Sequence, residues 1–151
     1  MKILVIHGPN LNMLGKREES IYGEKTLDEI NALLKKEARA LNVEVVTFQS
    51  NHEGALIDFV QEQADSAHGI IINPGALTHY GFSLRDALAD SKLPVIEVHL
   101  SNIYRREEWR ARSVVAPIAE GQITGLGWKG YLAALQLLVG KLKAHKSKYV
   151  L

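Results

Sequence analysis

The feature that most constrains how this chain can fold is an alternation of short apolar runs with amphipathic segments. The first run, residues 3–6, is continuously aliphatic, which is typical of a strand buried on both faces of a parallel sheet. Four more runs of strand length follow at residues 43–48, 69–72, 94–100 and 122–125. Patterns of helical spacing separate the runs, so the sequence predicts repeated βα units.

Capping patterns mark where two of these helices begin. Thr26 with Glu29 forms a capping box before a helix that we expect to end near residue 42, and Ser50 with Glu53 repeats the pattern before a helix that reaches residue 64. A third helix is predicted to end near residue 91, residues 106–112 read as a short charged helix, and an apolar stripe predicts a terminal helix after residue 127.

Consecutive βα units should have right-handed crossovers and a parallel sheet. The sequence therefore predicts an α/β fold: a flavodoxin-like three-layer sandwich with a five-stranded parallel sheet in the order 2-1-3-4-5. We expect one catalytic domain over residues 1–151, in which residues 141–151 form a basic tail that is frayed and solvated.

Composition excludes several classes of function. The net charge of +1 gives no field that would attract nucleic acid or a membrane surface. The chain has no cysteine, so disulfides, thiolate metal ligands and cysteine nucleophiles are excluded. The start of the sequence does not resemble a signal peptide, and no segment has the ~20 apolar residues of a membrane helix. We therefore expect a cytoplasmic protein.

Polar residues follow three of the predicted strands, at residues 7–10, 73–79 and 99–102. In open parallel sheets, ligands bind beyond the carboxyl ends of the strands where the strand order reverses, which here would bring these three segments around one crevice. Residues 7–25 are too irregular for a helix and long for a simple connection. Loops of this length in compact domains are usually functional or disordered.

Two pairs of residues are candidates for acid and base chemistry. His99 and Glu97 are two positions apart on a predicted strand, so they share a face, and the carboxylate could hold the imidazole in one tautomer. Tyr22 is a poor base unless a cation stabilises its phenolate, and Arg17 lies five residues earlier in the same loop. Core packing of the histidine and surface anchoring by the tyrosine are the structural alternatives.

Other readings of the polar residues remain open. Asn10, Asn12 and Asn73 could orient a water or a substrate hydroxyl, although asparagine also serves turns. His7, His79 and His99 with Glu97 could bind zinc in a metal-dependent hydrolase, although their spacing forms no compact ligand motif. A non-catalytic flavodoxin-like module that binds nucleotide or flavin is a third possibility, but neither GxGxxG nor GxxxxGK[ST] occurs.

Linked motifs in one order and spacing resemble a known family. They are HGPNLNMLGKRE with IYG, then QSNHEG, NPGALTH with LRDAL, and IEVHLSN with REEWR. Together they resemble the type II 3-dehydroquinate dehydratases from Lys2 to about Gly140. This resemblance implies a cofactor-free, flavodoxin-like lyase, commonly a homododecamer of four trimers, which converts 3-dehydroquinate to 3-dehydroshikimate in the shikimate pathway of aromatic amino acid and chorismate biosynthesis.

The same resemblance implies a role for each site residue and no metal. Tyr22 as phenolate abstracts a proton beside the substrate ketone, Arg17 stabilises the charge, and His99, oriented by Glu97, protonates the departing hydroxyl in an anti elimination. Asn10 holds a water against the enolate oxygen. The residues implied in substrate binding are Asn73, His79, Arg110, the backbone amides of Leu100 and Ser101, Arg106 at a lid, and Asp86, which reaches a neighbouring subunit's site.

Overall fold

The protein is described from a computed structural model, which covers the backbone of residues 1–147 and the side chains of residues 1–145. Within this range one sheet contains five strands: β1 (Lys2–His7), β2 (Glu44–Gln49), β3 (Gly69–Asn73), β4 (Val95–His99) and β5 (Gly121–Thr124). All neighbours pair in parallel, and the order is β2-β1-β3-β4-β5. The predicted fold class and strand order are confirmed.

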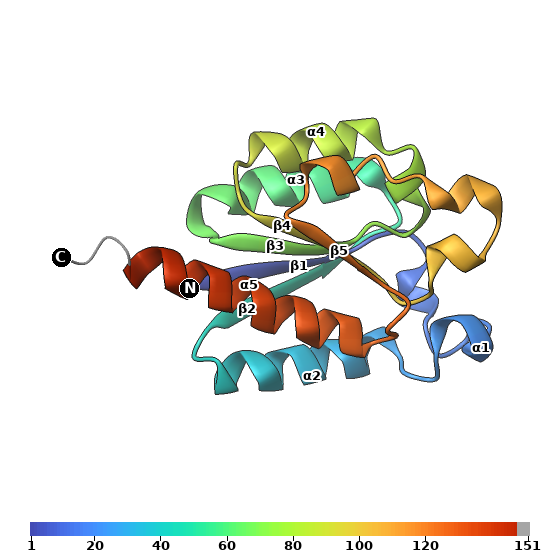
Figure 1. Ribbon diagram of the computed structural model, residues 1–151, viewed down its shortest axis with the longest axis horizontal. Helices are drawn as coiled ribbons and strands as arrows, with labels where there is room; N and C mark the ends of the chain where they lie inside the picture. Colours follow the sequence, from blue (N-terminus) through green and yellow to red (C-terminus); the bar gives the residue numbers. More distant parts are fainter. Residues whose placement is uncertain (148–151) are drawn as a thin grey trace.

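Helices cover both faces of the sheet (Figure 1). On one face lie α2 (Leu27–Ala40) and α5 (Lys129–Ser147), and on the other α3 (Glu53–Gln63) and α4 (Phe82–Asp90). Each face has its own apolar core because side chains alternate along a strand. On β1, for example, Ile3 and Val5 pack in the core between the sheet and helices α2 and α5. Leu4 and Ile6 pack in the core between the sheet and helices α3 and α4. These buried strands form a rigid support for the loops at their carboxyl ends.

One of the two predicted capping boxes is confirmed and the other is wrong. The Thr26 hydroxyl accepts a hydrogen bond from the Glu29 backbone N–H at 3.2 Å, and the Glu29 carboxylate accepts one from the Thr26 N–H at 2.8 Å. At the start of α3, the Ser50 hydroxyl instead accepts from the His52 N–H at 3.0 Å. The Glu53 carboxylate points across to α4 and accepts from the Leu84 N–H at 3.0 Å. Glu53 therefore links α3 to the first turn of its neighbour.

Three other predicted segments differ from the structure. Residues 106–112 do not form an α-helix; they include the 3₁₀ helix η5 (Glu108–Ala111). The long loop after β1 contains a single turn of helix, α1 (Glu19–Tyr22), although it was predicted too irregular for one. The predicted frayed tail is helical through residue 147, where α5 ends, and the last four residues of that tail lie outside the described residues.

The tail is tied to the body of the protein by its lysines. Lys141 pairs with Glu120, and the Lys143 ammonium donates to the Leu41 backbone carbonyl at 2.9 Å. These contacts reach the segment before β5 and the end of α2. Lys141 and Lys143 therefore hold this part of α5 against the rest of the protein.

The loops after β1 and β3 meet in a contact that only glycine permits. A Cβ atom built on Gly8 would lie 2.3 Å from the carbonyl oxygen of Pro74, inside the limit for any nonbonded pair. The backbone N–H of Gly8 donates to the Asn73 carbonyl at 2.7 Å, which explains why the two segments lie so close. Because residue 8 is glycine, the polar segments that follow β1 and β3 can lie in direct contact.

We expect Gly8→Ala to lower the free energy of unfolding by about 1–3 kcal/mol, because backbone atoms must move to admit the methyl group. Gly54→Ala is the matched control: nothing lies within 4 Å of a Cβ at that position in α3, so stability should be unchanged or slightly higher. Urea unfolding of both variants measures the difference. Equal midpoints for Gly8→Ala and the wild type would contradict this account of the close contact.

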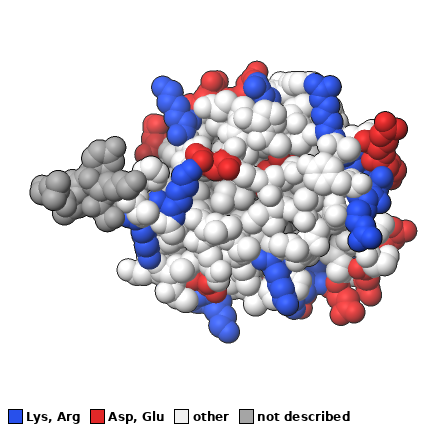
Figure 2. Space-filling view, in the orientation of Figure 1, with Lys and Arg blue, Asp and Glu red and all other residues white. Residues whose placement is uncertain are grey.

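The surface has no area dominated by one sign of charge on the face in Figure 2, where acidic and basic side chains lie interspersed. This agrees with the net charge of +1. None of the helices in the described part of the chain has the length and apolar character needed to cross a membrane.

Candidate active site

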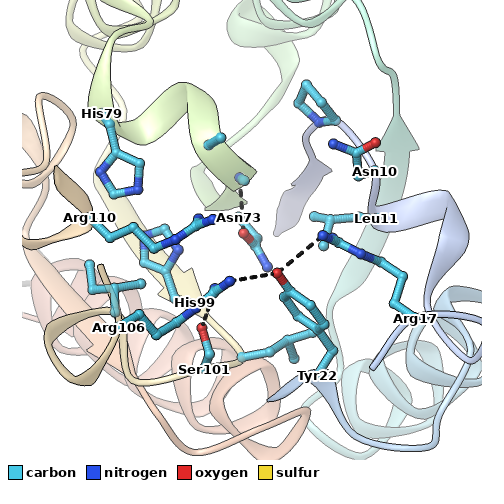
Figure 3. Close-up of a pocket in the computed structure, with 15 residues that line it drawn as sticks. Asn10, Leu11, Arg17, Tyr22, Asn73, His79, His99, Ser101, Arg106 and Arg110 are labelled. Atoms are coloured by element: carbon cyan, nitrogen blue, oxygen red, sulfur yellow. Dashed lines mark hydrogen bonds between the residues drawn. The ribbon is translucent and has the colours of Figure 1, made fainter. Parts of the chain in front are cut away.

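A pocket opens beyond the carboxyl ends of β1, β3 and β4 (Figure 3). Strand order reverses between β1 and β3, so the pocket lies where the rule for open parallel sheets places a ligand. Its lining includes most of the predicted site residues: Asn10, Arg17, Tyr22, Asn73, His79, His99, Leu100, Ser101, Arg106 and Arg110. Segments far apart in the sequence thus contribute to one cavity.

The hydroxyl of Tyr22 receives hydrogen bonds from two arginines (Figure 3). The Arg17 Nη2 atom lies 3.1 Å from the Tyr22 oxygen, and the Arg106 Nη2 atom lies 2.9 Å from it. The Arg17 guanidinium also lies over the tyrosine ring, with its carbon 4.1 Å from the ring centroid. A negative charge on this oxygen would therefore be stabilised by two cations, one from its own loop and one from the segment after β4.

Arg106 is oriented by contacts that lead back to the end of β4. Its Nη1 atom donates to the Ser101 hydroxyl at 3.1 Å, which places the guanidinium between Ser101 and Tyr22. Nearby, the Arg110 Nε atom donates to the Glu107 carboxylate at 2.6 Å. The direct contact of Arg106 with Tyr22 was not foreseen from the sequence, because the two residues are 84 positions apart.

His99 and Glu97 form the predicted pair at the end of β4. The His99 Nε2 atom lies 2.6 Å from the Glu97 Oε1 atom, and both side chains are almost completely buried. Thr78 and Ser113 add hydroxyl donors to the same carboxylate. Burial alone would raise the pKa of Glu97, but the hydrogen bonds from His99, Thr78 and Ser113 outweigh it and hold that pKa below its ordinary value. The carboxylate is therefore ionised at neutral pH.

An ionised Glu97 fixes the tautomer of its neighbour. Because a carboxylate only accepts, the Nε2 atom of His99 carries the proton in this contact. No side chain among residues 1–145 hydrogen bonds to the other ring nitrogen, Nδ1, and His99 lines the pocket. Nδ1 is thus the nitrogen available to a bound molecule.

Asn10, in the loop after β1, and Asn73, the last residue of β3, bring amide groups to the pocket. Asn10 has a positive φ of 68°, and its backbone N–H donates to the Asn51 side chain at 2.9 Å. The Oδ1 atom of Asn73 accepts from the Gly75 N–H at 3.1 Å (Figure 3). Each asparagine therefore lies in or beside a turn, and each can stabilise that turn and bind a ligand at the same time.

His79 lies across the pocket from Tyr22, at the end of the 3₁₀ helix η3 (Gly75–His79). Its Nδ1 atom donates to the Arg112 carbonyl at 2.7 Å, and the Trp109 ring packs edge-on at 5.0 Å between centroids. Burial lowers the pKa of His79, while the hydrogen bond to Arg112 opposes that change. The imidazole presents Nε2 as an acceptor when it is neutral.

The third histidine of the zinc hypothesis, His7, lies in a separate environment. Its ring nitrogens contact the Tyr131 hydroxyl and the Asn31 carbonyl oxygen, each at 2.9 Å. Burial lowers the pKa of His7 to about 4, against a smaller opposing effect of Asn31, so the ring is neutral. Among the described residues no three histidine, aspartate or glutamate side chains converge as a metal would require. The described residues therefore do not form the zinc site that the sequence left open.

Four of the candidate residues lie outside the pocket lining: His7, Asn12, Asp86 and Glu97. Glu97 sits behind His99, where it can act only through the imidazole. Asp86 is on α4, with its side chain 67% exposed and paired to Arg85 at 2.8 Å. The contribution of Asp86 to a neighbouring subunit's site stays a prediction. The sequence reasoning missed Thr78 and Ser113, although Thr78 lies within the strand-end segment 73–79 that it had selected.

The sequence matches a family model over most of its length. The model for class II dehydroquinases matches residues 1–139. The chain belongs to this family. It is 68% identical over 140 residues to a 3-dehydroquinate dehydratase of Roseiflexus castenholzii, an alignment that covers 93% of this chain and 89% of that protein. It is 57% identical to the enzyme of that name from Halothermothrix orenii, over 94% and 96% of the two chains.

A solved structure of a class II dehydroquinase has the same fold. The type II dehydroquinase of Butyrivibrio crossotus superposes with a TM-score of 0.89 at 50% identity, covering 91% of this chain and 97% of that one. The family resemblance inferred from the sequence motifs is therefore confirmed. Since the match includes β1 through most of α5, all of the residues around the pocket fall within the region shared with the family.

Proposed function

We propose that this class II dehydroquinase is a 3-dehydroquinate dehydratase that acts as a single catalytic domain without a cofactor. The observation that carries the proposal is a tyrosine hydroxyl held by two guanidinium groups in the same pocket as a histidine–carboxylate pair. A base and an acid with their charge partners are what removal of water beside a ketone requires. The names of the relatives supply the substrate.

In the first step, the Tyr22 phenolate removes a proton from the carbon beside the substrate ketone. The electrons move onto the ketone oxygen and give an enolate, and Tyr22 becomes a neutral phenol. Arg17 and Arg106 stabilise the phenolate before transfer, because both donate to its oxygen. A water held by Asn10 donates to the enolate oxygen. The negative charge is therefore met by hydrogen-bond donors at each position it occupies.

In the second step, the enolate collapses and the carbon–oxygen bond to the leaving hydroxyl breaks. The Nδ1 atom of protonated His99 gives its proton to that hydroxyl, which departs as water, while Nε2 continues to donate to Glu97. The product contains a carbon–carbon double bond conjugated to the ketone. Proton return from Tyr22 to His99 through solvent restores both groups. Elimination is anti, because the base and the acid approach opposite faces of the ring.

Substrate binding uses the remaining polar residues of the pocket. The amides of Leu100 and Ser101 bind the substrate carboxylate, and the nearby guanidinium of Arg106, bonded to the Ser101 hydroxyl, adds a positive charge. Asn73, His79 and Arg110 bind hydroxyl groups or the carboxylate. Residues 13–23 act as a lid that brings Tyr22 over the ring and excludes water during the reaction.

The assembly and setting are proposed from the family resemblance. The enzyme acts in the cytoplasm on the shikimate route to chorismate and aromatic amino acids, and forms a homododecamer of four trimers. The exposed Asp86 on α4 and the exposed rings of Tyr80 and Phe82 beside it support a subunit contact on this side of the molecule. In that contact Asp86 reaches the site of the adjacent subunit.

The proposal is tested by following the ultraviolet absorbance of the conjugated ketone formed from 3-dehydroquinate. We expect turnover by the purified protein, and the same rate after exhaustive dialysis against a chelator, because the side chains themselves provide the acid, the base and the charge stabilisation. Failure of the untreated protein to form the product would reject the dehydratase function. Loss of activity on chelation, with recovery on adding metal, would reject the cofactor-free mechanism.

A further inference from the structure

We infer that Ser113, together with Thr78, is a positioning residue for the Glu97–His99 pair: the two hydroxyls keep the carboxylate ionised, so that it accepts the Nε2 proton of His99 and leaves Nδ1 to take up and deliver the proton of the acid step. This inference rests on the proposed function, in which His99 is the acid. It assigns a role to a loop serine that lies outside the pocket lining.

The two hydroxyl groups share the Glu97 carboxylate with His99. Ser113 Oγ lies 2.9 Å from Oε1 and 3.0 Å from Oε2 of Glu97, and Thr78 Oγ1 donates to Oε1. Glu97 has 0% exposure, so water does not supply replacement donors. Among the described residues, Ser113 is the one side chain that hydrogen bonds to Oε2. The second carboxylate oxygen therefore depends on this serine.

The backbone determines which way the serine proton points. The N–H groups of Val115 and Ala116 donate to Ser113 Oγ at 3.1 and 2.9 Å, at the start of the 3₁₀ helix η6 (Ala116–Ile118). A hydroxyl has two lone pairs and one proton. Because the two N–H groups occupy the lone pairs, the hydroxyl acts as a donor, and the oxygens within its reach are the two of Glu97 and that of Thr78. Two of its three possible acceptors therefore belong to the carboxylate.

The same loop is anchored beside the pocket at two more points. The Val114 N–H donates to the Thr78 carbonyl at 2.7 Å, and the Arg112 carbonyl accepts from His79 at 2.7 Å. Thr78 and Ser113 are consequently held side by side, with their hydroxyl oxygens 3.0 Å apart. This loop, residues 112–116, connects the segment carrying Arg106 and Arg110 to the carboxylate behind the acid.

Loss of the Ser113 hydroxyl has a specific chemical consequence. Glu97 would retain its charge with one oxygen lacking a donor, which is costly in a buried site and favours a neutral carboxyl group. A neutral Glu97 can donate to Nε2 of His99 instead of accepting from it. The imidazole would then be a neutral ring with its one proton on Nδ1, which is a far weaker acid than the imidazolium that an ionised Glu97 stabilises.

The test combines nitrogen NMR of ¹⁵N-histidine-labelled protein with steady-state kinetics. The wild type is expected to show the Nε2–H tautomer at His99, identified by the signal missing from a His99→Ala variant. In Ser113→Ala we expect a substantial Nδ1–H population and a kcat about 10- to 100-fold lower with KM changed less than about threefold. Thr78→Val, which removes the other hydroxyl at constant shape, should act in the same direction.

Ser91→Ala is the matched control. Like Ser113, Ser91 accepts a hydrogen bond from the backbone N–H two residues later, that of Leu93. Because Ser91 lies at the end of α4 and makes no hydrogen bond with Glu97, Ser91→Ala should retain the wild-type tautomer and kcat. Ser113→Thr keeps a hydroxyl and should restore the Nε2–H form. Unchanged tautomer and kcat in both Ser113→Ala and Thr78→Val would overturn the inference. The tautomer is measured without substrate, so its result does not depend on the dehydratase assay. If Ser113→Ala does not fold, the tautomer and kcat of Thr78→Val decide whether the inference holds.

Discussion

Tyr22→Phe is expected to lower kcat for dehydration by about 10²- to 10⁴-fold, the contribution of a positioned base, while the fold is retained. The change removes only the hydroxyl oxygen. That oxygen accepts from Arg17 at 3.1 Å and from Arg106 at 2.9 Å, and in the proposed mechanism it takes the proton from carbon. The phenylalanine ring still occupies the same space beneath the Arg17 guanidinium. The loss should therefore appear in kcat far more than in KM.

Tyr104→Phe provides the matched control for this experiment. Its hydroxyl also takes part in a hydrogen bond, to Gln122 at 2.7 Å, but it does not line the pocket and should be dispensable for turnover. Arg17→Ala should resemble Tyr22→Phe, because Arg17 supplies one of the two cations. Circular dichroism confirms that each variant is folded. Near-normal turnover by Tyr22→Phe would remove this residue from the role of base.

His99→Ala should reduce dehydration by a similar factor of about 10²–10⁴, through loss of the acid in the second step. Proton abstraction by Tyr22 remains possible in this variant. Substrate deuterated beside the ketone should therefore exchange its label with water faster than it forms product, and NMR of recovered substrate measures that exchange. A substrate analogue with a better leaving group should restore part of the rate, since its departure needs less help from an acid.

The alternative outcome is equally specific. If His99→Ala abolishes both label exchange and product formation while circular dichroism remains that of the wild type, His99 contributes to the first step, and the assignment of separate roles is wrong. Removal of the imidazole also deprives Glu97 of its donor at 2.6 Å, although the two hydroxyls remain. Thermal unfolding of the variant measures how much of the effect is structural.

The sequence predicted the sheet well because its signals are local. Continuous aliphatic runs such as residues 3–6 identify buried strands, and their alternation with helices predicts parallel pairing, for which the flavodoxin-like order is a common arrangement. The same rule located the pocket, because strand ends can be read from where apolar runs stop. The Thr26 capping box was predictable for the same reason: both partners lie within one turn.

The errors came from contacts between distant segments. Glu53 has the correct spacing to cap its own helix, but α4 lies close enough for its carboxylate to accept from the Leu84 N–H. The role of Ser113 depends on η6 directing a hydroxyl toward β4, which no local pattern reveals. Arg106 was predicted in the site, but its contact with the Tyr22 oxygen required the folded positions of two loops. Local periodicity contains no information of this kind.

The acid and the base are supported by different parts of the fold, and this affects how the enzyme can change during evolution. Glu97 and His99 lie on the buried strand β4, so a substitution there must also satisfy the packing of the sheet. Tyr22 and Arg17 lie on a surface segment that makes fewer demands on packing. Under the proposed mechanism, substitutions can therefore alter proton abstraction at a lower cost in stability than they can alter the departure of water, which depends on the buried strand.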